Sequence, residues 1–396
     1  MVPGRDADVS VHAGLLWPQT GSLWAAGNMY FDNLLESALL GLEGDERITV
    51  IEPAPPGGTD AARHPGAGVA TYELGPSDSR LAGLVRTARQ RFGVPERAVA
   101  AAIARSGVGM VFGDANQMGR YRVPWVGWIP DFQHREAPEY FSASERDARD
   151  RAYARMSRDA ALVLLSSEDA RSHFERLSPE HADKARVASF VSLMAADVFA
   201  QDASSVAIRY GITGPFVVVP NQWWRHKNHE AAIRAAAILR ERGSDITWVF
   251  TGALADYRDP THISTLLQLI AQLGVSKHVI VLGMLPRDDQ LQLMRAAEMV
   301  VQPSLFEGWS TVVEDAKTLG QRIVVSDLPV HREQEPGAAL FFDPHSPEQL
   351  ADAVAAMLDG ACQRPDEETA RRASIDRARI FGRRFLDICT EAAGHR

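Results

Sequence analysis

Cysteine is scarce in this sequence. Only Cys362 and Cys389 occur among 396 residues, and they lie far apart in the chain. Two isolated cysteines provide no metal-ligand spacing, and such low usage is typical of proteins from a reducing compartment. The sequence therefore favours a reducing compartment and gives no indication of a cysteine-based metal site.

An excess of positive charge and long apolar runs are also missing. The formal net charge is -9, which argues against nucleic acid as the main partner. No window approaches the roughly 18 apolar residues that a membrane-spanning helix needs. Residues 1–17 lack a basic region followed by a long apolar stretch, so we expect no signal peptide. These absences together predict a cytoplasmic protein.

Hydrophobic residues make up 45% of the chain, enough for two domains that each bury a core. Short apolar runs bounded by Gly, Pro or Asp alternate with amphipathic segments in the second half. Strands are predicted at 215–220, 246–252, 278–283, 299–304, 322–327 and 339–343, and helices at 228–243, 263–274 and 286–298. Alternation of this length indicates a parallel sheet with helices on both faces.

The first half repeats this pattern less regularly. Strands are predicted at 9–17, 47–52, 109–114, 123–130 and 160–167, and helices at 29–41 and 142–160. Residues 199–214 are interpreted as a linker between the halves, and 368–392 as a long amphipathic helix. We therefore expect an α/β protein of two Rossmann-like domains whose parallel sheets face a central cleft, where ligands bind at the carboxyl ends of the strands.

The stretch QPSLFEGWSTVVEDAKTLGQ, residues 302–321, follows a predicted strand and enters a helix near Ser310. Free amides at such a junction suit an anion, and Gly308 allows the backbone to approach a ligand. Ser310 and Thr311 can cap the helix or bind phosphate. Glu307 would repel phosphate but accepts hydrogen bonds from hydroxyls. The segment therefore predicts a ligand that carries both phosphate and hydroxyl groups, as a sugar phosphate does.

This segment resembles the EX7E motif of GT4-type (group 1) retaining glycosyltransferases of the GT-B fold. The resemblance extends over the second half, through 279–304 and 339–358, and more loosely to 126–142 and 161–174. It implies an acceptor-side domain at 1–205, a nucleotide-sugar-binding domain at 206–365, and a C-terminal helix at 366–396 that packs back toward the first domain.

Carried over by position, Glu307 is the first acid of the motif and contacts hydroxyls of the donor sugar. The second acid falls on Asp315, which would hydrogen-bond the ribose although its side chain is one methylene shorter than glutamate. Glu314 is rotated by about 100° from its neighbour on a helix. We interpret Glu314 as a solvated helix residue.

The family also places an Arg and a Lys, five residues apart, against the diphosphate. Lys227 fits the Lys, whereas Gln222 stands at the Arg position, and Arg225 either supplies the missing charge or faces solvent. A surface lysine is the alternative for Lys227. Trp223 and Trp224 either shape the sugar pocket or lie on a face between the domains.

In the first half, the family often has a His-Asp pair after a strand. Pro130 holds the His position and Asp131 the Asp position. His134 is the candidate replacement, with a structural histidine as the alternative. The resemblance of residues 20–28 to the family's Gly-rich loop adds acceptor- or phosphate-loop candidates at Gly21, Gly27 and Asn28.

The expected site has two groups of residues in addition to this loop. The catalytic group is Glu307, Lys227, Arg225, Asp131 and His134. The donor-binding group is Asn221, Gln222, Gly252, Met284, Leu285, Gly308, Trp309, Ser310, Thr311 and Asp315. No metal and no cofactor are expected, because side-chain cations would meet the diphosphate. Asp6 and Asp8 form a DxD sequence that we discount because it precedes the first strand, and Glu333 matches a family acid or pins a loop.

Two clusters of arginines stand out in this acidic chain. One spans 80–105 and the other 371–384. Basic amphipathic surface attracts anionic lipid, at roughly 1 kcal/mol per residue. The clusters therefore favour peripheral attachment at the inner face of the cytoplasmic membrane, near a lipid-linked acceptor; solvated helix faces are the alternative.

The main hypothesis is a hexosyltransferase that moves a hexose from a nucleotide-diphosphate sugar to a glycan or lipid-linked acceptor, with retention, in cell-surface polysaccharide assembly. One alternative is a nucleotide-sugar 2-epimerase on the same fold. Another is a nucleotide-sugar-binding protein without catalysis, which is favoured by the departures from the family pattern at Gln222, Pro130 and Asp315. Base, sugar, acceptor and oligomeric state are not specified by the sequence.

Overall fold

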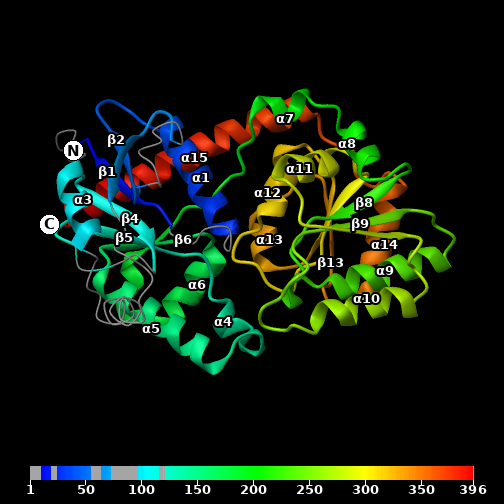
Figure 1. Ribbon diagram of the computed structural model, residues 1–396. Helices are drawn as coiled ribbons and strands as arrows, with labels where there is room; N and C mark the ends of the chain where they lie inside the picture. The colour runs from blue at the N-terminus through cyan, green and yellow to red at the C-terminus, as the bar shows by residue number, and fades with distance from the viewer. Residues whose placement is uncertain are drawn as a thin grey trace, which may run out of the picture. The chain divides into compact units, whose positions relative to one another are not determined.

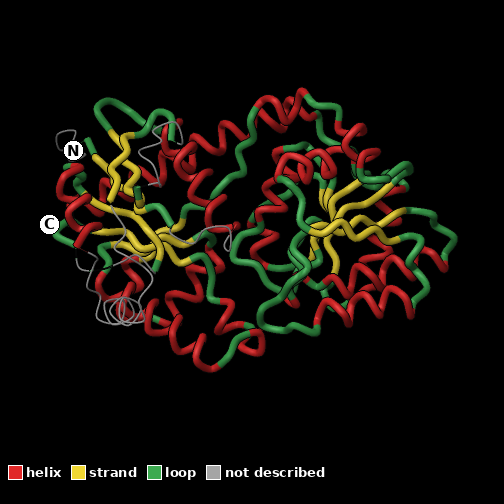
Figure 2. Tube along the Cα trace, in the orientation of Figure 1, coloured by secondary structure: helices red, strands yellow, loops and turns green. Residues whose placement is uncertain are grey.

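The computed structural model describes residues 10–18, 25–54, 64–72, 97–115, 119 and 121–395. The chain divides into two compact units. The first comprises residues 1–132, 143–190 and 377–396, and the second comprises 133–142 and 191–376. Each unit has one sheet flanked by helices (Figures 1 and 2).

The first unit has a seven-stranded sheet of order β3-β2-β1-β4-β5-β6-β7, in which every pairing is parallel. Its strands are β1 (His12–Leu16), β2 (Arg47–Pro53), β3 (Gly68–Tyr72), β4 (Met110–Asp114), β5 (Trp125–Ile129), β6 (Leu162–Leu165) and β7 (Ala185–Val187). Its helices are α1 (Ala25–Leu40), α3 (Arg97–Ser106), α5 (Ala143–Asp159), α6 (Glu168–Leu177) and the 3-10 helix η4 (Pro179–Lys184).

The second unit has a six-stranded parallel sheet of order β10-β9-β8-β11-β12-β13. Its strands are β8 (Phe216–Val219), β9 (Thr247–Thr251), β10 (Val279–Gly283), β11 (Met299–Gln302), β12 (Ile323–Ser326) and β13 (Ala339–Phe342). Its helical segments are α4 (Gln133–Glu136), η3 (Pro138–Tyr140), α7 (Ala196–Ala200), α8 (Ala203–Arg209), η5 (Arg225–Lys227), α9 (His229–Glu241), α10 (His262–Gln272), α11 (Arg287–Ala296), α12 (Thr311–Thr318), α13 (Pro329–Glu333) and α14 (Pro347–Leu358).

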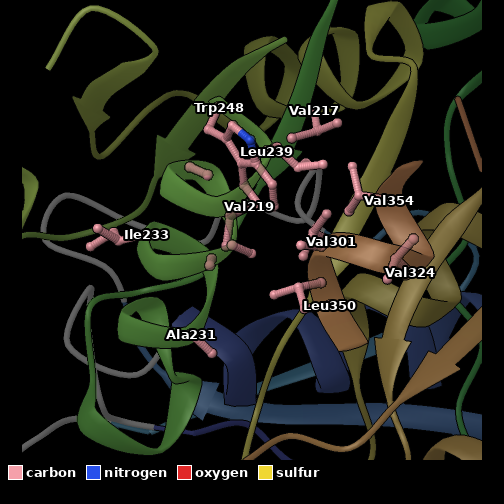
Figure 3. Packing of buried hydrophobic residues seen from close by; sticks show 14 of the residues in the cluster. Val217, Val219, Ala231, Ile233, Leu239, Trp248, Val301, Val324, Leu350 and Val354 are labelled. Carbon is pink, nitrogen blue, oxygen red and sulfur yellow. The ribbon is translucent and has the colours of Figure 1, made fainter. Parts of the chain in front are cut away.

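Alternate residues of the second sheet enter two separate cores. Val217 and Val219 of β8 pack with residues of α9 and α14, in the cluster drawn in Figure 3. Phe216 and Val218 pack on the opposite face, with residues of α8, α11 and α12. A strand buried on both faces is continuously apolar, as the run FVVV is. All six strands predicted for the second half are confirmed.

Residues 199–214 do not link the two halves but lie within the second unit, so that interpretation was wrong. Asp202 caps α8 by accepting a hydrogen bond from the amide of Ser204 at 3.1 Å. Val198 and Val206 are buried in the second unit's core, and the Tyr210 hydroxyl donates to Asp289 of α11 at 2.6 Å. Helices α7 and α8 therefore belong to the packed second unit.

Two strands, β3 and β7, were missed because β3 is mostly only partly buried and β7 has three residues. Helix α1 also begins four residues earlier than predicted. Helix α15 (Glu367–Gly394) starts in the second unit and ends in the first.

Candidate active site

The candidate site lies where the order of strands in the second sheet reverses. The chain runs from β8 outward to β10, then returns to place β11 on the other side of β8. Ligands of open α/β sheets bind at the carboxyl ends of the two strands that flank such a reversal. The segment after β8 contains Lys227 and the segment after β11 contains Glu307. The topology therefore explains how residues 80 positions apart meet.

Lys227 and Glu307 form an ion pair. The Lys227 Nζ donates to Glu307 Oε1 at 2.6 Å, and the two side chains are 18% and 8% exposed. Ser304 also donates to Glu307 Oε1, at 2.7 Å. A carboxylate this buried is stable only with such donors, because desolvation of an unpaired charge is costly.

A chain of amides orients this carboxylate. The Asn221 amide donates to Gln302 Oε1 at 2.7 Å, and Gln302 Nε2 then donates to Glu307 Oε1 at 2.7 Å. Gln302 is fully buried at the end of β11. The hydrogen bonds from Lys227, Ser304 and Gln302 all end on Oε1, so that within the described residues Oε2 is the oxygen available to a ligand.

Gly252 explains how the segment after β8 is held. It follows β9 with φ +99°, and a Cβ built there would lie 2.2 Å from the carbonyl oxygen of Asn221. Its amide donates to Gly283 at 2.8 Å. Only glycine combines this backbone angle with this approach. The glycine thus lets the loops after β8 and β9 approach each other, and binding of the donor by Gly252 stays a prediction.

Helix α12 begins at the site with a capped end. Ser310 is the N-cap, and its Oγ accepts from the Val313 amide at 3.4 Å. The Ser310 amide itself donates to Gln334 Oε1 at 3.1 Å. The Ser310 amide, one of those predicted for an anion, is therefore engaged within the protein. Gly308 and Thr311 are partly buried at this end of the helix.

Glu314 is not a solvated residue, and that interpretation was wrong. It is 1% exposed and accepts from Gln334 Nε2 at 3.0 Å and from Lys317 Nζ at 3.2 Å. The error arose because Gln334, twenty residues away, covers this face of α12. Glu314 connects α12 to the residue that follows α13.

Asp315 is fully buried, and both of its oxygens are occupied. Arg287 binds it through two nitrogens, one of them at 2.7 Å, and the Ser192 hydroxyl donates to it at 2.6 Å. A ribose hydroxyl has no open path to Asp315 in this structure, because the side chain is fully buried beneath its bonds to Arg287 and Ser192. Arg287, 33% exposed at the start of α11, is a site residue that sequence reasoning missed.

Arg225 is exposed on η5, and its guanidinium lies 5.7 Å from the ring centroid of Tyr140. Its amide donates to Asp256 at 3.1 Å. The same Asp256 accepts from Arg258, whose guanidinium lies 5.0 Å from the ring centroid of Trp224. Arg225 thus lies on the same short helix as Lys227 and is exposed to solvent.

The two tryptophans after β8 differ. Trp223 is fully buried, with its ring 4.7 Å from that of His229, so neither interpretation offered for it applies. Trp224 and Gln222 are partly buried. Met284 is 59% exposed after β10, while Leu285 packs against the core. Trp309 is partly buried beside Ser310.

The residues predicted in the first half fall in both units. Asp131 follows β5 and is partly buried in the first unit. His134 is 1% exposed on α4, which belongs to the second unit. Gly27 and Asn28 lie in the first turn of α1 and not in a loop, which corrects that prediction. Gly21 lies outside the described residues.

Within the described part of the chain, no helix is long and apolar enough to cross a membrane. A search of the same residues finds no group of three or more His, Cys, Asp or Glu side chains placed to hold a metal ion.

Comparison with known proteins gives matches of two kinds. Residues 211–376 match the family model described as glycosyl transferases group 1. D-inositol 3-phosphate glycosyltransferase of Corynebacterium glutamicum is 33% identical over 165 residues, which cover 39% of this chain and 37% of that protein. The Salinispora tropica protein of the same name is 32% identical over 185 residues, 43% of this chain and 37% of the relative. The matches thus span little more than a third of these relatives.

Solved structures match nearly the whole chain. A glycosyltransferase from Rickettsia africae aligns with a TM-score of 0.66 at 15% identity, covering 98% of this chain and 100% of that one. Anabaena HepE, solved in complex with UDP and glucose, aligns with a TM-score of 0.63 at 18% identity, covering 96% and 97%. The GT-B fold predicted from the sequence is confirmed. The facing of the two sheets across a cleft stays a prediction.

Proposed function

We propose, from the match of residues 211–376 to the model of the group 1 glycosyl transferases, that this chain transfers a hexose from a nucleotide-diphosphate sugar to a glycan or lipid-linked acceptor. The observation that carries the proposal is the pair of Lys227 and Glu307 at the strand reversal, with one oxygen of the acid left for a ligand. HepE, a neighbour in fold, has been solved with UDP-glucose, which supports a donor of this class.

In this proposal the two charged residues divide the donor between them. Glu307 accepts a hydrogen bond from a sugar hydroxyl through Oε2. Lys227, already held by Oε1, directs its remaining N–H groups toward the diphosphate. Positive charge placed where the leaving diphosphate gains negative charge lowers the barrier to its departure. The exposed Arg225 is the candidate for a second cation.

The stereochemical course and the setting are further parts of the proposal. We infer retention, with the departing phosphate helping to deprotonate the acceptor hydroxyl, so that no protein nucleophile is required. The expected setting is cell-surface polysaccharide assembly at the inner face of the cytoplasmic membrane.

Contacts of α15 reduce the charge available for binding to membranes. Arg371 and Arg372 pair with Glu368, and Arg383 is bound by Glu46. Flotation with anionic liposomes at low salt tests the attachment, and failure to float removes the membrane from the proposal.

The proposal is tested by incubating the protein with UDP-, GDP- and dTDP-sugars. Slow release of nucleoside diphosphate and free sugar supports a transferase. Formation of an epimer identifies the 2-epimerase alternative, and binding without turnover identifies a binding protein.

A further inference from the structure

Arg287 lies at the same edge of the second sheet as the candidate site. It is the first residue of α11, which follows β10, and its partner Asp315 belongs to α12, which follows β11. In a parallel sheet, a helix that follows a strand begins at the carboxyl edge of the sheet. The segments that carry Lys227 and Glu307 also follow strands, β8 and β11, so all four residues belong to elements that begin at this edge.

Hydrogen bonds place the start of α12 beside the acid of the site. Gln302 Nε2 donates to Glu307 Oε1 at 2.7 Å and to Ser310 Oγ, at the N-cap of α12, at 3.1 Å. Asp315 lies about 8 Å further along this helix, at 1.5 Å per residue. Side chains of a helix lean toward its N-terminus, so the Asp315 carboxylate and Arg287 lie toward the end of α12 that begins at the site.

Arg287 keeps hydrogen-bond donors that the protein does not use. Its Nη1 and Nη2 donate to the two oxygens of Asp315, to which the Ser192 hydroxyl also donates. A guanidinium has five N–H groups, so three remain, and none of these has a partner within the described part of the chain. The arginine side chain is 33% exposed, whereas that of the aspartate is 1% exposed. A buried acid thus holds an arginine whose remaining donors are accessible from outside.

The part of the donor that these N–H groups would meet follows from what the rest of the site binds. In the proposed function, Glu307 and Lys227 take the sugar and the diphosphate at the ends of β11 and β8. The nucleoside is the remaining part, and its ribose hydroxyls and base carbonyls offer neutral acceptor oxygens. The Asp315 carboxylate is covered, so a ligand at this position meets donors and not an acceptor.

We propose that Arg287 binds the nucleoside of the nucleotide sugar through these N–H groups. Asp315 is then a positioning residue, which holds the arginine and does not touch the ribose itself. The inference rests on the proposed function and deepens it, because it names the side chain that recognises the nucleoside.

The test separates the nucleoside from the diphosphate. The probe is whichever of UDP, GDP and dTDP binds wild type most tightly in calorimetric titration, together with the free nucleoside of that diphosphate. Affinity for the free nucleoside is measured by displacement of the bound diphosphate, which gives access to weak binding. Arg287→Lys keeps a positive charge for Asp315 but lacks the planar fork of N–H groups. Arg287→Met with Asp315→Asn, which leaves no unpaired charge, serves if the lysine variant is unstable.

Two further variants provide comparisons. Arg295 lies in the last turn of the same helix and is also bound by a carboxylate, since its Nε and Nη2 donate to Glu367 at 2.7 and 2.9 Å. That turn precedes β11 and so lies toward the opposite edge of the sheet. Arg295→Lys therefore disrupts an equivalent ion pair away from the site. Lys227→Met removes the cation that the proposed function places against the diphosphate.

We expect Arg287→Lys to weaken binding of the free nucleoside and of the diphosphate by the same factor, about tenfold, as for hydrogen bonds lost from a charged donor. Lys227→Met should weaken the diphosphate and leave the free nucleoside as in wild type. Arg295→Lys should change neither affinity, and thermal unfolding of each variant checks that the domain remains folded.

Other outcomes overturn the inference. Wild-type affinities in Arg287→Lys would mean that the arginine contacts no ligand, and weakening of the diphosphate alone would assign it to a phosphate. Absence of displacement by free nucleoside in wild type, or an equal loss in Arg295→Lys, would also refute it. If Lys227→Met leaves the diphosphate unchanged while Arg287→Lys weakens the nucleoside, the placement of the diphosphate fails and the inference stands. If wild type binds none of the three diphosphates, the proposed function fails and the inference fails with it.

Discussion

Replacement of both members of the Lys227–Glu307 pair should separate stability from catalysis. Lys227→Met removes the cation and leaves a carboxylate that is only 8% exposed. Removal of one partner from a buried pair costs about 3–5 kcal/mol of stability. Because the lysine is 18% exposed, we expect Lys227→Met to cost less, about 2–3 kcal/mol. Glu307→Gln alone should cost about 1–2 kcal/mol, because its donors lose a charged acceptor.

The double variant removes the charge imbalance. Lys227→Met with Glu307→Gln should lie within about 1 kcal/mol of wild type, so the double-mutant cycle should give a coupling energy of about 3–4 kcal/mol. Turnover should nevertheless fall by about 100-fold or more in all three variants, because each lacks a group directed at the donor. Urea unfolding followed by tryptophan fluorescence measures the free energy of unfolding, and nucleotide release measures turnover.

A matched pair in the same domain provides the control. Lys317 and Glu314 are also an ion pair, with exposures of 16% and 1%. Variants Lys317→Met and Glu314→Gln should show a comparable stability cycle while turnover of the double variant stays within about tenfold of wild type. The reasoning would be refuted by a double Lys227/Glu307 variant with wild-type turnover, or by a coupling energy near zero.

Three further predictions concern other parts of the second unit. Gly252→Ala should destabilise it by about 3 kcal/mol or more in chemical unfolding, whereas Gly243→Ala, with φ +86° and open space around the Cβ, should cost about 1 kcal/mol; equal costs would contradict the clash. Arg287→Met should lower stability by about 3 kcal/mol, because Asp315 has no exposure to water, and a neutral result would show that Asp315 relaxes outward. Burial lowers the pKa of His229 to about 3, so only the unfolded chain takes up its proton near pH 6. Stability should therefore fall as pH drops below about 6.5, and His229→Phe should remove about 2 kcal/mol of this loss between pH 7 and 5. An equal loss in wild type and variant would mean that the pKa of the buried His229 stays near 6.5.

Sequence periodicity was sufficient for the second unit because its strands are buried on both faces and bounded by turn residues. The runs at 216–219 and 299–302 are apolar throughout, so their assignment did not depend on tertiary contacts. Lys227 and Glu307 each follow one of these strands, which made their proximity predictable. Residues 199–214 were harder, since the helices there are short and depend on burial of Val198 and Val206.

Partners that are distant in sequence could not be predicted. Gln302 appears in the sequence as a polar residue that ends an apolar strand, a signal that could have marked it for attention. The bond between Arg287 and Asp315 joins residues 28 positions apart, and it depends on how α11 and α12 pack. The contact that buries Glu314 comes from Gln334, which no local pattern relates to α12.

Helix α15 has a consequence for the order in which the chain folds. Its later turns complete the first unit: Phe385 packs on Phe112 with ring centroids 5.1 Å apart, and Arg383 is bound by Glu46. At Gly382 a Cβ would lie 1.7 Å from the carbonyl oxygen of Ser37, so the two helix backbones touch. These residues are synthesised after the whole second unit. The N-terminal unit is translated first, but its core stays incomplete until these residues of α15 have been synthesised. The C-terminal unit is therefore the first that can finish folding.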